Sequence, residues 1–304
     1  MKVADNLAQL IGNTPLVRIQ KLNPGPGVVY AKLEMFNPYS IKDRAALNML
    51  QQAEQSGLLK PGGHIVEPTS GNMGIALAFL AAVKGYTITL TMPENMSPER
   101  VKMLKALGAH IVLTPAQNGM SGAIKKAQEI LNQTPGAFMP SQFENPANAQ
   151  AHRQTALEIL KDLDRRVDIL VCGVGTGGTL SGTAQELKKH CPGLYTAAVE
   201  PQDSPVLSGG KPGPHKLQGI GAGFIPKILD TKLIDEIIPV TAENAGQTAR
   251  ALAKTEGILA GISSGAALWA ALQIAARPQN EGKNIVVIFP DSGERYLSTW
   301  EFEE

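Results

Sequence analysis

Cysteine is scarce in this chain: Cys172 and Cys191 are the only two among 304 residues. Two thiols cannot form the framework of a small disulfide-stapled protein. Neither the cysteines nor the five histidines show the spacing of metal ligands. We therefore expect no structural metal and no dependence on disulfides.

Excess charge and long hydrophobic runs are also missing. Lys and Arg number 28 against 27 Asp and Glu, so the net charge is +1 and no overall field attracts nucleic acid or an anionic membrane. The apolar run 75–83 is far shorter than the roughly 20 residues that span a bilayer. The N-terminal MKVADNLAQL has Asp5, Asn6 and Gln9 where a signal peptide needs apolar residues. We expect a cytoplasmic protein that binds neither nucleic acid nor membrane.

The composition that is present, 43% hydrophobic and 18% charged, is typical of a globular protein with a sizeable core. At roughly 150 residues per domain, the length predicts about two domains. Short β-branched runs alternate with turns and helical patterns, which predicts an α/β fold of mainly parallel sheets with helices on both faces. We place strands at 65–66, 87–92, 111–113, 168–172, 197–200 and 285–289, and helices at 75–84, 98–107, 123–131 and 179–190. A break near 140–150, rich in Pro and Asn, predicts a boundary between two lobes.

A first candidate motif is Ser40-Ile41-Lys42-Asp43-Arg44, directly before a helical pattern. With Ser40 as N-cap, Lys42 falls in the first helical turn, where the helix dipole disfavours a cation. The same field favours a neutral, nucleophilic amine, as a Schiff-base lysine requires. The alternative is a solvated lysine paired with Asp43, and the motif alone favours that alternative.

A second candidate is the turn 67–74 (EPTSGNMG) between a strand and a helix. Consecutive N–H groups and hydroxyls at a helix N-terminus suit a carboxylate or a phosphate. A well-capped strand-to-helix junction needs the same residue types, so the turn alone does not decide between the two.

A third candidate is 173–179 (GVGTGGT), which follows a predicted strand and precedes a helix. Its glycines let backbone N–H groups approach a phosphate closely. The spacing also satisfies G-x-G-x-x-G, and Glu200 ends the next strand where a ribose-binding acid would stand. A dinucleotide site using Gly173, Gly175, Gly178 and Glu200, as in an NAD-binding oxidoreductase, is therefore a rival interpretation; a plain tight turn is another.

Taken together, the chain resembles the cysteine synthases (O-acetylserine sulfhydrylases), which are fold-type II pyridoxal-phosphate enzymes related to the tryptophan synthase β subunit. The resemblance implies that the bound phosphate is that of pyridoxal 5′-phosphate. It also implies a two-lobed, three-layer α/β/α fold: a smaller mobile domain at 39–148, and a larger domain from 1–38 and 149–304 that carries the phosphate loop. The matching segments, in family order, are IGNTPLVRI (11–19), SIKDR (40–44), EPTSGN (67–72), KALGAHIVLT (105–114), GVGTGGTLSG (173–182), residues 199–226, EGILAGISSGAA (256–267) and SGERYLST (292–299).

The resemblance also assigns roles to single residues. Lys42 would form the internal aldimine and remove the substrate α-proton. Ser263 would face the pyridine nitrogen, with Asp291 as the rival partner; a neutral hydroxyl there favours β-elimination through an α-aminoacrylate. The other cofactor-binding residues would be Asn72 at the 3′ oxygen and Gly175, Thr176, Gly177, Gly178 and Thr179 at the phosphate. The amino-acid substrate would be bound by Thr69, Ser70, Gly71, Asn72, Met73 and Gln142.

The implied activity is the conversion of O-acetyl-L-serine and sulfide to L-cysteine and acetate. The alternative is a cystathionine β-synthase that uses O-acetylserine or serine with homocysteine. Met73 departs from the family pattern, which has Thr there, so a hydroxyl contact near the substrate carboxylate is lost. The family resemblance further implies a homodimer and, for some members, binding of the C-terminal tail of serine acetyltransferase.

Overall fold

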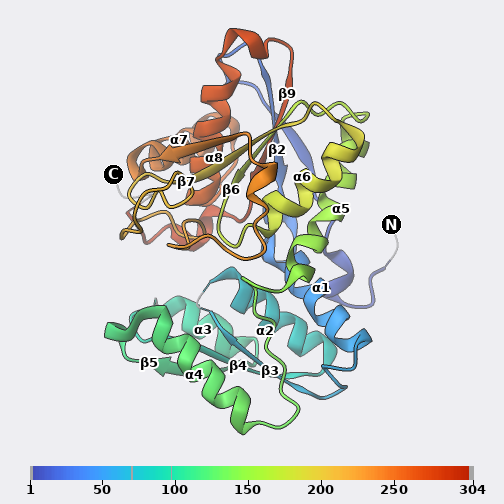
Figure 1. Cartoon of the computed structure of the whole chain (residues 1–304), viewed down its shortest axis with the longest axis vertical. Coiled ribbons are helices and arrows are strands. Elements are labelled where there is room, and N and C mark those ends of the chain that lie inside the picture. Colours follow the sequence, from blue (N-terminus) through green and yellow to red (C-terminus); the bar gives the residue numbers. More distant parts are fainter. Residues whose placement is uncertain (1–2, 70, 97, 301–304) are drawn as a thin grey trace. The chain divides into compact units, whose positions relative to one another are not determined.

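The computed structural model describes residues 3–69, 71–96 and 98–300 (Figure 1). The described chain divides into two compact units. The smaller holds the segment up to Ile11 together with Lys42–Asn148; the larger holds Gly12–Ile41 and the chain from Ala149 onward. The segment up to Ile11 thus groups with the smaller unit, whereas the prediction assigned it to the larger. A mobile domain at 39–148 stays a prediction.

The described part of the smaller unit contains a parallel sheet in the order β3-β4-β5. Its apolar strands alternate with helices, as the sequence pattern predicted. The strands are β3 (His64–Pro68), β4 (Thr87–Pro93) and β5 (His110–Thr114), and the helices are α1 (Lys42–Gln55), α2 (Asn72–Lys84), α3 (Pro98–Ala106) and α4 (Gly119–Gln133), with 3-10 turns η1 (Leu7–Leu10) and η3 (Ala116–Asn118).

Helices α1 and α2 pack against each other and run in the same direction. Their C-terminal turns are joined: Lys84 Nζ lies 2.9 Å from Glu54 Oε1, and the Tyr86 hydroxyl donates to the same oxygen at 2.8 Å. Because the helices have 14 and 13 residues, their N-termini also lie at one end of the pair. Lys42 and Asn72, the first residues of α1 and α2, are therefore at the same end of the smaller unit.

The larger unit is built on a six-stranded sheet in the order β1-β2-β9-β6-β7-β8, as far as the described residues go. All neighbours are parallel except β1 and β2. The strands are β1 (Leu16–Ile19), β2 (Val28–Leu33), β6 (Ile169–Gly173), β7 (Tyr195–Pro201), β8 (Glu236–Val240) and β9 (Asn284–Phe289). The helices are α5 (Pro146–Asp162, whose first residues belong to the smaller unit), α6 (Gly178–His190), α7 (Ala242–Glu256) and α8 (Ile262–Ala275), with 3-10 turns η2 (Glu34–Phe36), η4 (Thr231–Leu233), η5 (Pro278–Asn280) and η6 (Gly293–Tyr296).

The central strand β6 shows why these strands are apolar throughout. Ile169 and Val171 enter the core cluster that contains α8, whereas Leu170 and Cys172 enter the cluster that contains residues of α5 and α6. Successive side chains of a strand point to opposite faces, so a sheet covered on both faces needs hydrophobic residues at every position. Figure 1 shows α7 and α8 on one face of the larger sheet and α5 and α6 on the other.

The α/β class with mainly parallel sheets is confirmed. The sequence prediction omitted the antiparallel pair β1–β2, strand β8 and helices α5 and α7. Helix α5 begins at Pro146, inside the predicted break, because proline is well accommodated in a first helical turn. None of the helices in the described ranges combines the length and hydropathy of a membrane span.

Candidate functional site

Lys42 is the first residue of α1, as the N-terminal motif predicted. Asp43 and Arg44, which follow it, are buried, while Lys42 itself is half-buried. A lysine at this position keeps its amine at the positive end of the helix dipole. This is the placement that a nucleophilic lysine needs.

The turn after β3 leads directly into α2. Gly71 is the N-cap in an extended conformation and Asn72 is the first helical residue. Thr69 is anchored because its N–H donates to Thr91 O at 3.1 Å. Met73, the second residue of α2, is buried, with 1% exposed. Ser70 lies outside the described residues.

Gln142 lies beside the same strand end. Residue 138 pairs with β3 through the bonds Val66 N to Phe138 O and Phe138 N to His64 O, both 2.9 Å. At the end of β3, Gln142 N donates to Glu67 Oε1 at 3.2 Å. The smaller unit therefore brings four of the predicted residues to one end: Lys42, Thr69, Asn72 and Gln142.

The sequence analysis did not identify Glu67 as a residue of this region. Its carboxyl group is buried and accepts from Ser141 N at 2.9 Å as well as from Gln142 N. Burial raises the pKa of Glu67 to about 7, although the two N–H donors act in the opposite direction. The available signal was an acidic residue inside the buried strand segment HIVEP.

The glycine-rich loop 174–177 connects the carboxyl end of β6 to the first turn of α6. Gly177 has φ +82°, a left-handed conformation that favours glycine. A Cβ on Gly175 would lie 2.4 Å from the carbonyl oxygen of Gly219, so this position accepts no side chain without movement of the backbone. The first N–H groups of α6 have no acceptor within the helix and, with the buried Thr176, form a site suited to a phosphate.

Thr179 is tied to α5 by a second residue that the sequence analysis missed. Its hydroxyl lies 3.2 Å from His152 Nε2, and His152 Nδ1 lies 3.2 Å from the Thr155 hydroxyl. His152 is buried, so α5 supports the start of α6 from within the larger unit. Its separation from the loop in sequence left no pattern by which it could be found.

Ser263 lies in the first turn of α8, after the N-cap Gly261, and is buried. A Cβ on Gly219 would be 3.8 Å from Ser263 Oγ, so Gly219 lies beside Ser263 as well as beside Gly175 of the phosphate loop. Asp291, the rival partner for a pyridine nitrogen, accepts from the Tyr296 hydroxyl at 2.7 Å. The larger unit therefore brings Gly175–Thr179 and Ser263 together.

Glu200 argues against a dinucleotide site. Its carboxylate accepts from Leu207 N at 2.7 Å, from Ser208 N at 3.0 Å and from the Ser208 hydroxyl at 2.5 Å. The side chain is buried, with 2% exposed. A carboxylate held in this way is not presented to a ribose.

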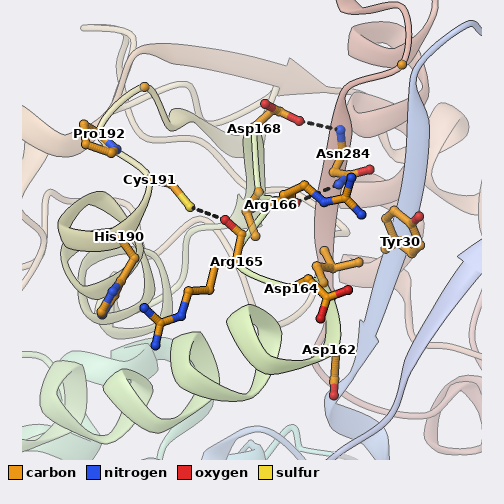
Figure 2. A pocket seen from close by; sticks show the side chains of 14 residues that line it. Tyr30, Asp162, Asp164, Arg165, Arg166, Asp168, His190, Cys191, Pro192 and Asn284 are labelled. Carbon is orange, nitrogen blue, oxygen red and sulfur yellow. Dashed lines mark hydrogen bonds between the residues drawn. The ribbon is translucent and has the colours of Figure 1, made fainter.

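The larger unit has a polar hollow of about 660 Å³. Arg165, Arg166, His190 and Cys191 are among the residues that line it (Figure 2). Asp168 and Asn284, whose hydrogen bond is drawn, stand at the amino ends of β6 and β9. The phosphate loop follows the carboxyl end of β6, so the hollow lies at the opposite edge of the sheet. It contains none of the predicted site residues.

Comparisons with known proteins identify the family of this chain. The family model of pyridoxal-phosphate dependent enzymes matches residues 7–291. A cysteine synthase of Staphylococcus aureus is 54% identical over 98% of this chain and 97% of its own. A crystal structure of cysteine synthase from Entamoeba histolytica has a TM-score of 0.96 at 47% identity, covering 99% of this chain and 91% of that one. The O-acetylserine dependent cystathionine β-synthase of Helicobacter pylori has a TM-score of 0.92 at 38% identity, with all of both chains covered.

The site residues of the smaller unit and those of the larger unit each match one part of pyridoxal phosphate in their chemistry. Amide N–H groups and threonine hydroxyls at the start of α6 match a phosphate dianion, and the lysine amine at the start of α1 matches an aldehyde. The Ser263 hydroxyl, next to Gly219, can hydrogen-bond a pyridine nitrogen. The chain belongs to the cysteine synthase (O-acetylserine sulfhydrylase) family of pyridoxal-phosphate dependent enzymes.

Proposed function

We propose that this protein is a cysteine synthase. The reaction replaces the β-acetoxy group of O-acetyl-L-serine by sulfide: the Cβ–O bond breaks, a Cβ–S bond forms, and acetate leaves. The observation that carries the proposal is the 54% identity to the Staphylococcus aureus enzyme over nearly the whole of both chains. The arrangement of the site residues within each unit supports it.

Lys42 is the proposed catalytic residue. The bound cofactor supplies an electron sink for the substrate Cα. Lys42 holds the cofactor covalently between turnovers, then takes the proton from Cα and returns it at the end of the reaction. Its place at the positive end of α1 favours the neutral amine that this proton transfer requires.

The remaining cofactor contacts are proposed as follows. The phosphate is held by Gly175, Thr176, Gly177, Gly178 and Thr179. Gly177 has a left-handed φ that favours glycine, and the close approach of the Gly219 carbonyl leaves no room for a side chain at position 175. Asn72 donates to the 3′ oxygen and Ser263 faces the pyridine nitrogen. A neutral hydroxyl does not keep the ring protonated, which favours loss of the β-substituent over other reactions at Cα.

The amino-acid carboxylate is proposed to bind at the turn after β3. Its donors are the Gln142 side chain and the residues of the turn: Thr69, Ser70, Gly71, Asn72 and the backbone N–H of Met73. Thr69 and Gln142 are both anchored to the strand end by backbone hydrogen bonds. We also propose that the domain at 39–148 moves on substrate binding and excludes water from the reacting atoms.

A second candidate function is cystathionine formation from homocysteine, which the similarity to the Helicobacter pylori enzyme favours. The two activities share the donor half-reaction and differ in the thiol acceptor. Holoenzyme given O-acetyl-L-serine with equal sulfide and homocysteine decides between them. We expect cysteine as the main product; a majority of cystathionine would overturn the proposal. Replacing O-acetyl-L-serine by L-serine or O-phosphoserine in the same assay tests the donor.

The family resemblance also supports three proposals about the protein in the cell: a homodimer, a cytoplasmic location, and binding of the C-terminal tail of serine acetyltransferase. Sedimentation of the purified protein tests the first. A peptide-binding assay with that tail tests the third.

A further inference from the structure

Glu67 joins two segments that the proposed function uses separately. It is the penultimate residue of β3 and stands two residues before Thr69. Its two carboxyl oxygens each accept one backbone N–H: Oε2 from Ser141 at 2.9 Å and Oε1 from Gln142 at 3.2 Å. The side chain is 1% exposed. One buried carboxyl group thus links the turn that begins at Thr69 to the backbone of Gln142.

The backbone that Glu67 holds is otherwise unfavourable. Ser141 has φ +55°, a left-handed conformation that costs a residue with a Cβ about 1 kcal/mol. The Ser141 carbonyl accepts from Glu144 N at 2.9 Å and Asn145 N at 3.0 Å, and the Gln142 carbonyl accepts from Asn148 Nδ2 at 2.8 Å. These bonds fix the carbonyl side of the turn, and Glu67 fixes its N–H side.

Glutamine, which has nearly the same shape, does not reproduce this pair of bonds. A carboxylate offers two acceptor oxygens, whereas glutamine offers one oxygen and an NH₂ group that would face a backbone N–H. A buried N–H left without an acceptor is costly, so the turn would shift. Because Gln142 is itself only 7% exposed, a shift of its backbone moves its side chain as well.

We propose that Glu67 is a positioning residue for the substrate: through the Ser141 and Gln142 amides it holds the Gln142 side chain where the α-carboxylate of the amino acid binds. The proposal rests on the proposed function only in assigning Gln142 to that carboxylate. Glu67 does not touch the reacting atoms. It sets donor affinity rather than the rate of the chemical steps.

The test compares Glu67→Gln with the parent holoenzyme. We expect the KM for O-acetyl-L-serine to rise about tenfold while kcat stays within about twofold, because an interaction with the carboxylate is weakened equally in ground and transition states. The matched control is Glu94→Gln. Glu94 follows the neighbouring strand β4 and its carboxylate also caps a backbone N–H, that of Ala116 at 3.2 Å. It has no bond to the turn at 141–142 among the described contacts, so its KM should not change.

A double-mutant cycle shows whether Glu67 acts through Gln142. In the Gln142→Ala background, Glu67→Gln should have no further effect on KM, because the group that Glu67 positions is already gone. Additive effects would overturn the proposal. In the parent background, a fall in kcat as large as the rise in KM for Glu67→Gln would overturn the proposal too. That result would indicate a general structural defect.

Two readouts keep this test independent of the sulfide reaction. Binding of L-serine to the holoenzyme is followed by the initial change in the cofactor spectrum. Its Kd should rise about tenfold in Glu67→Gln even if sulfide is not the acceptor. Hydrogen exchange of the Ser141 and Gln142 amides in the holoenzyme without substrate should become faster in the variant. Unchanged exchange together with an unchanged Kd contradicts the proposal.

Discussion

Lys84 lies with its Nζ 2.9 Å from Glu54 Oε1, and this ion pair joins the last turns of α2 and α1. A lysine in the last turn also interacts favourably with the negative end of its helix. The pair lies at the C-terminal ends of two helices that pack against each other in the same direction. Lys42, the proposed catalytic residue, and the start of α2, far apart in sequence, therefore lie at one end of the smaller unit.

The same pair gives a prediction for Tyr86, whose hydroxyl donates to Glu54 at 2.8 Å. Burial and the negative charge of Glu54 raise the pKa of Tyr86 to about 12. In Glu54→Gln the charge is removed, so this pKa should fall towards 10. Ultraviolet titration of tyrosinate measures it, with Tyr86→Phe identifying the transition. Glu129→Gln, which removes a surface pair with Lys126, should leave the titration unchanged.

The phosphate loop predicts a position-specific effect of alanine. In Gly175→Ala the new Cβ would meet the Gly219 carbonyl at 2.4 Å, so the loop must move and cofactor affinity should fall by at least about tenfold. Gly193→Ala is the control, since its Cβ would meet none of the described atoms within 4 Å. Equilibrium dialysis of pyridoxal phosphate measures both. Equal affinity in the two variants would contradict the assignment of the loop.

Met73 tests whether the departure from the family pattern alters the donor. Because its side chain is buried, we expect Met73→Thr to leave the KM for O-acetyl-L-serine within about threefold. The lost apolar volume should lower the free energy of unfolding by about 2 kcal/mol. Met120→Thr, at a 39% exposed position of α4, should not lower it. A large fall in KM without loss of stability would show that a hydroxyl at position 73 reaches the substrate.

Glu67 gives the stability of the protein a defined pH dependence. Its pKa is raised from 4.5 in the unfolded chain to about 7 in the folded protein, so between these values the folded state binds more protons. The Glu67 contribution to stability is therefore fully present below pH 4.5 and is lost as pH rises through about 7. Denaturant unfolding at several pH values should show this fall in the parent but not in Glu67→Gln. Parallel pH profiles for the two proteins would contradict the assignment.

The sequence predicted the parallel α/β class, all three strands of the smaller sheet and three of the six described strands of the larger one, because buried strands such as Ile285–Phe289 carry an unbroken apolar pattern. Strand β1 was missed since Val17 and Arg18 are exposed and the pattern there is not apolar. The omission of β2 has no such reason, because its segment VVYAKL is mostly apolar. The candidate motifs were visible because Lys42, Asn72 and Gly178 begin helices and stand next to glycine or serine turns.

What the sequence could not predict depends on tertiary contacts. Glu67 acts on Gln142 across a separation of 75 residues, and His152 acts on Thr179 across 27. Neither pair has a local pattern, because the contact exists only after the strand end and the loop, or the two helices, have packed. Glu200 had the spacing of a ribose ligand, but the loop at 207–208 occupies its carboxylate.

The central claim is that the Lys42 amine carries the cofactor. Borohydride reduction of the holoenzyme, followed by peptide mapping, measures this directly. The account predicts one pyridoxyl group, on the peptide that contains Lys42, and none after Lys42→Ala. A reduced adduct on any other lysine, or no adduct in a protein that still forms cysteine, would contradict it.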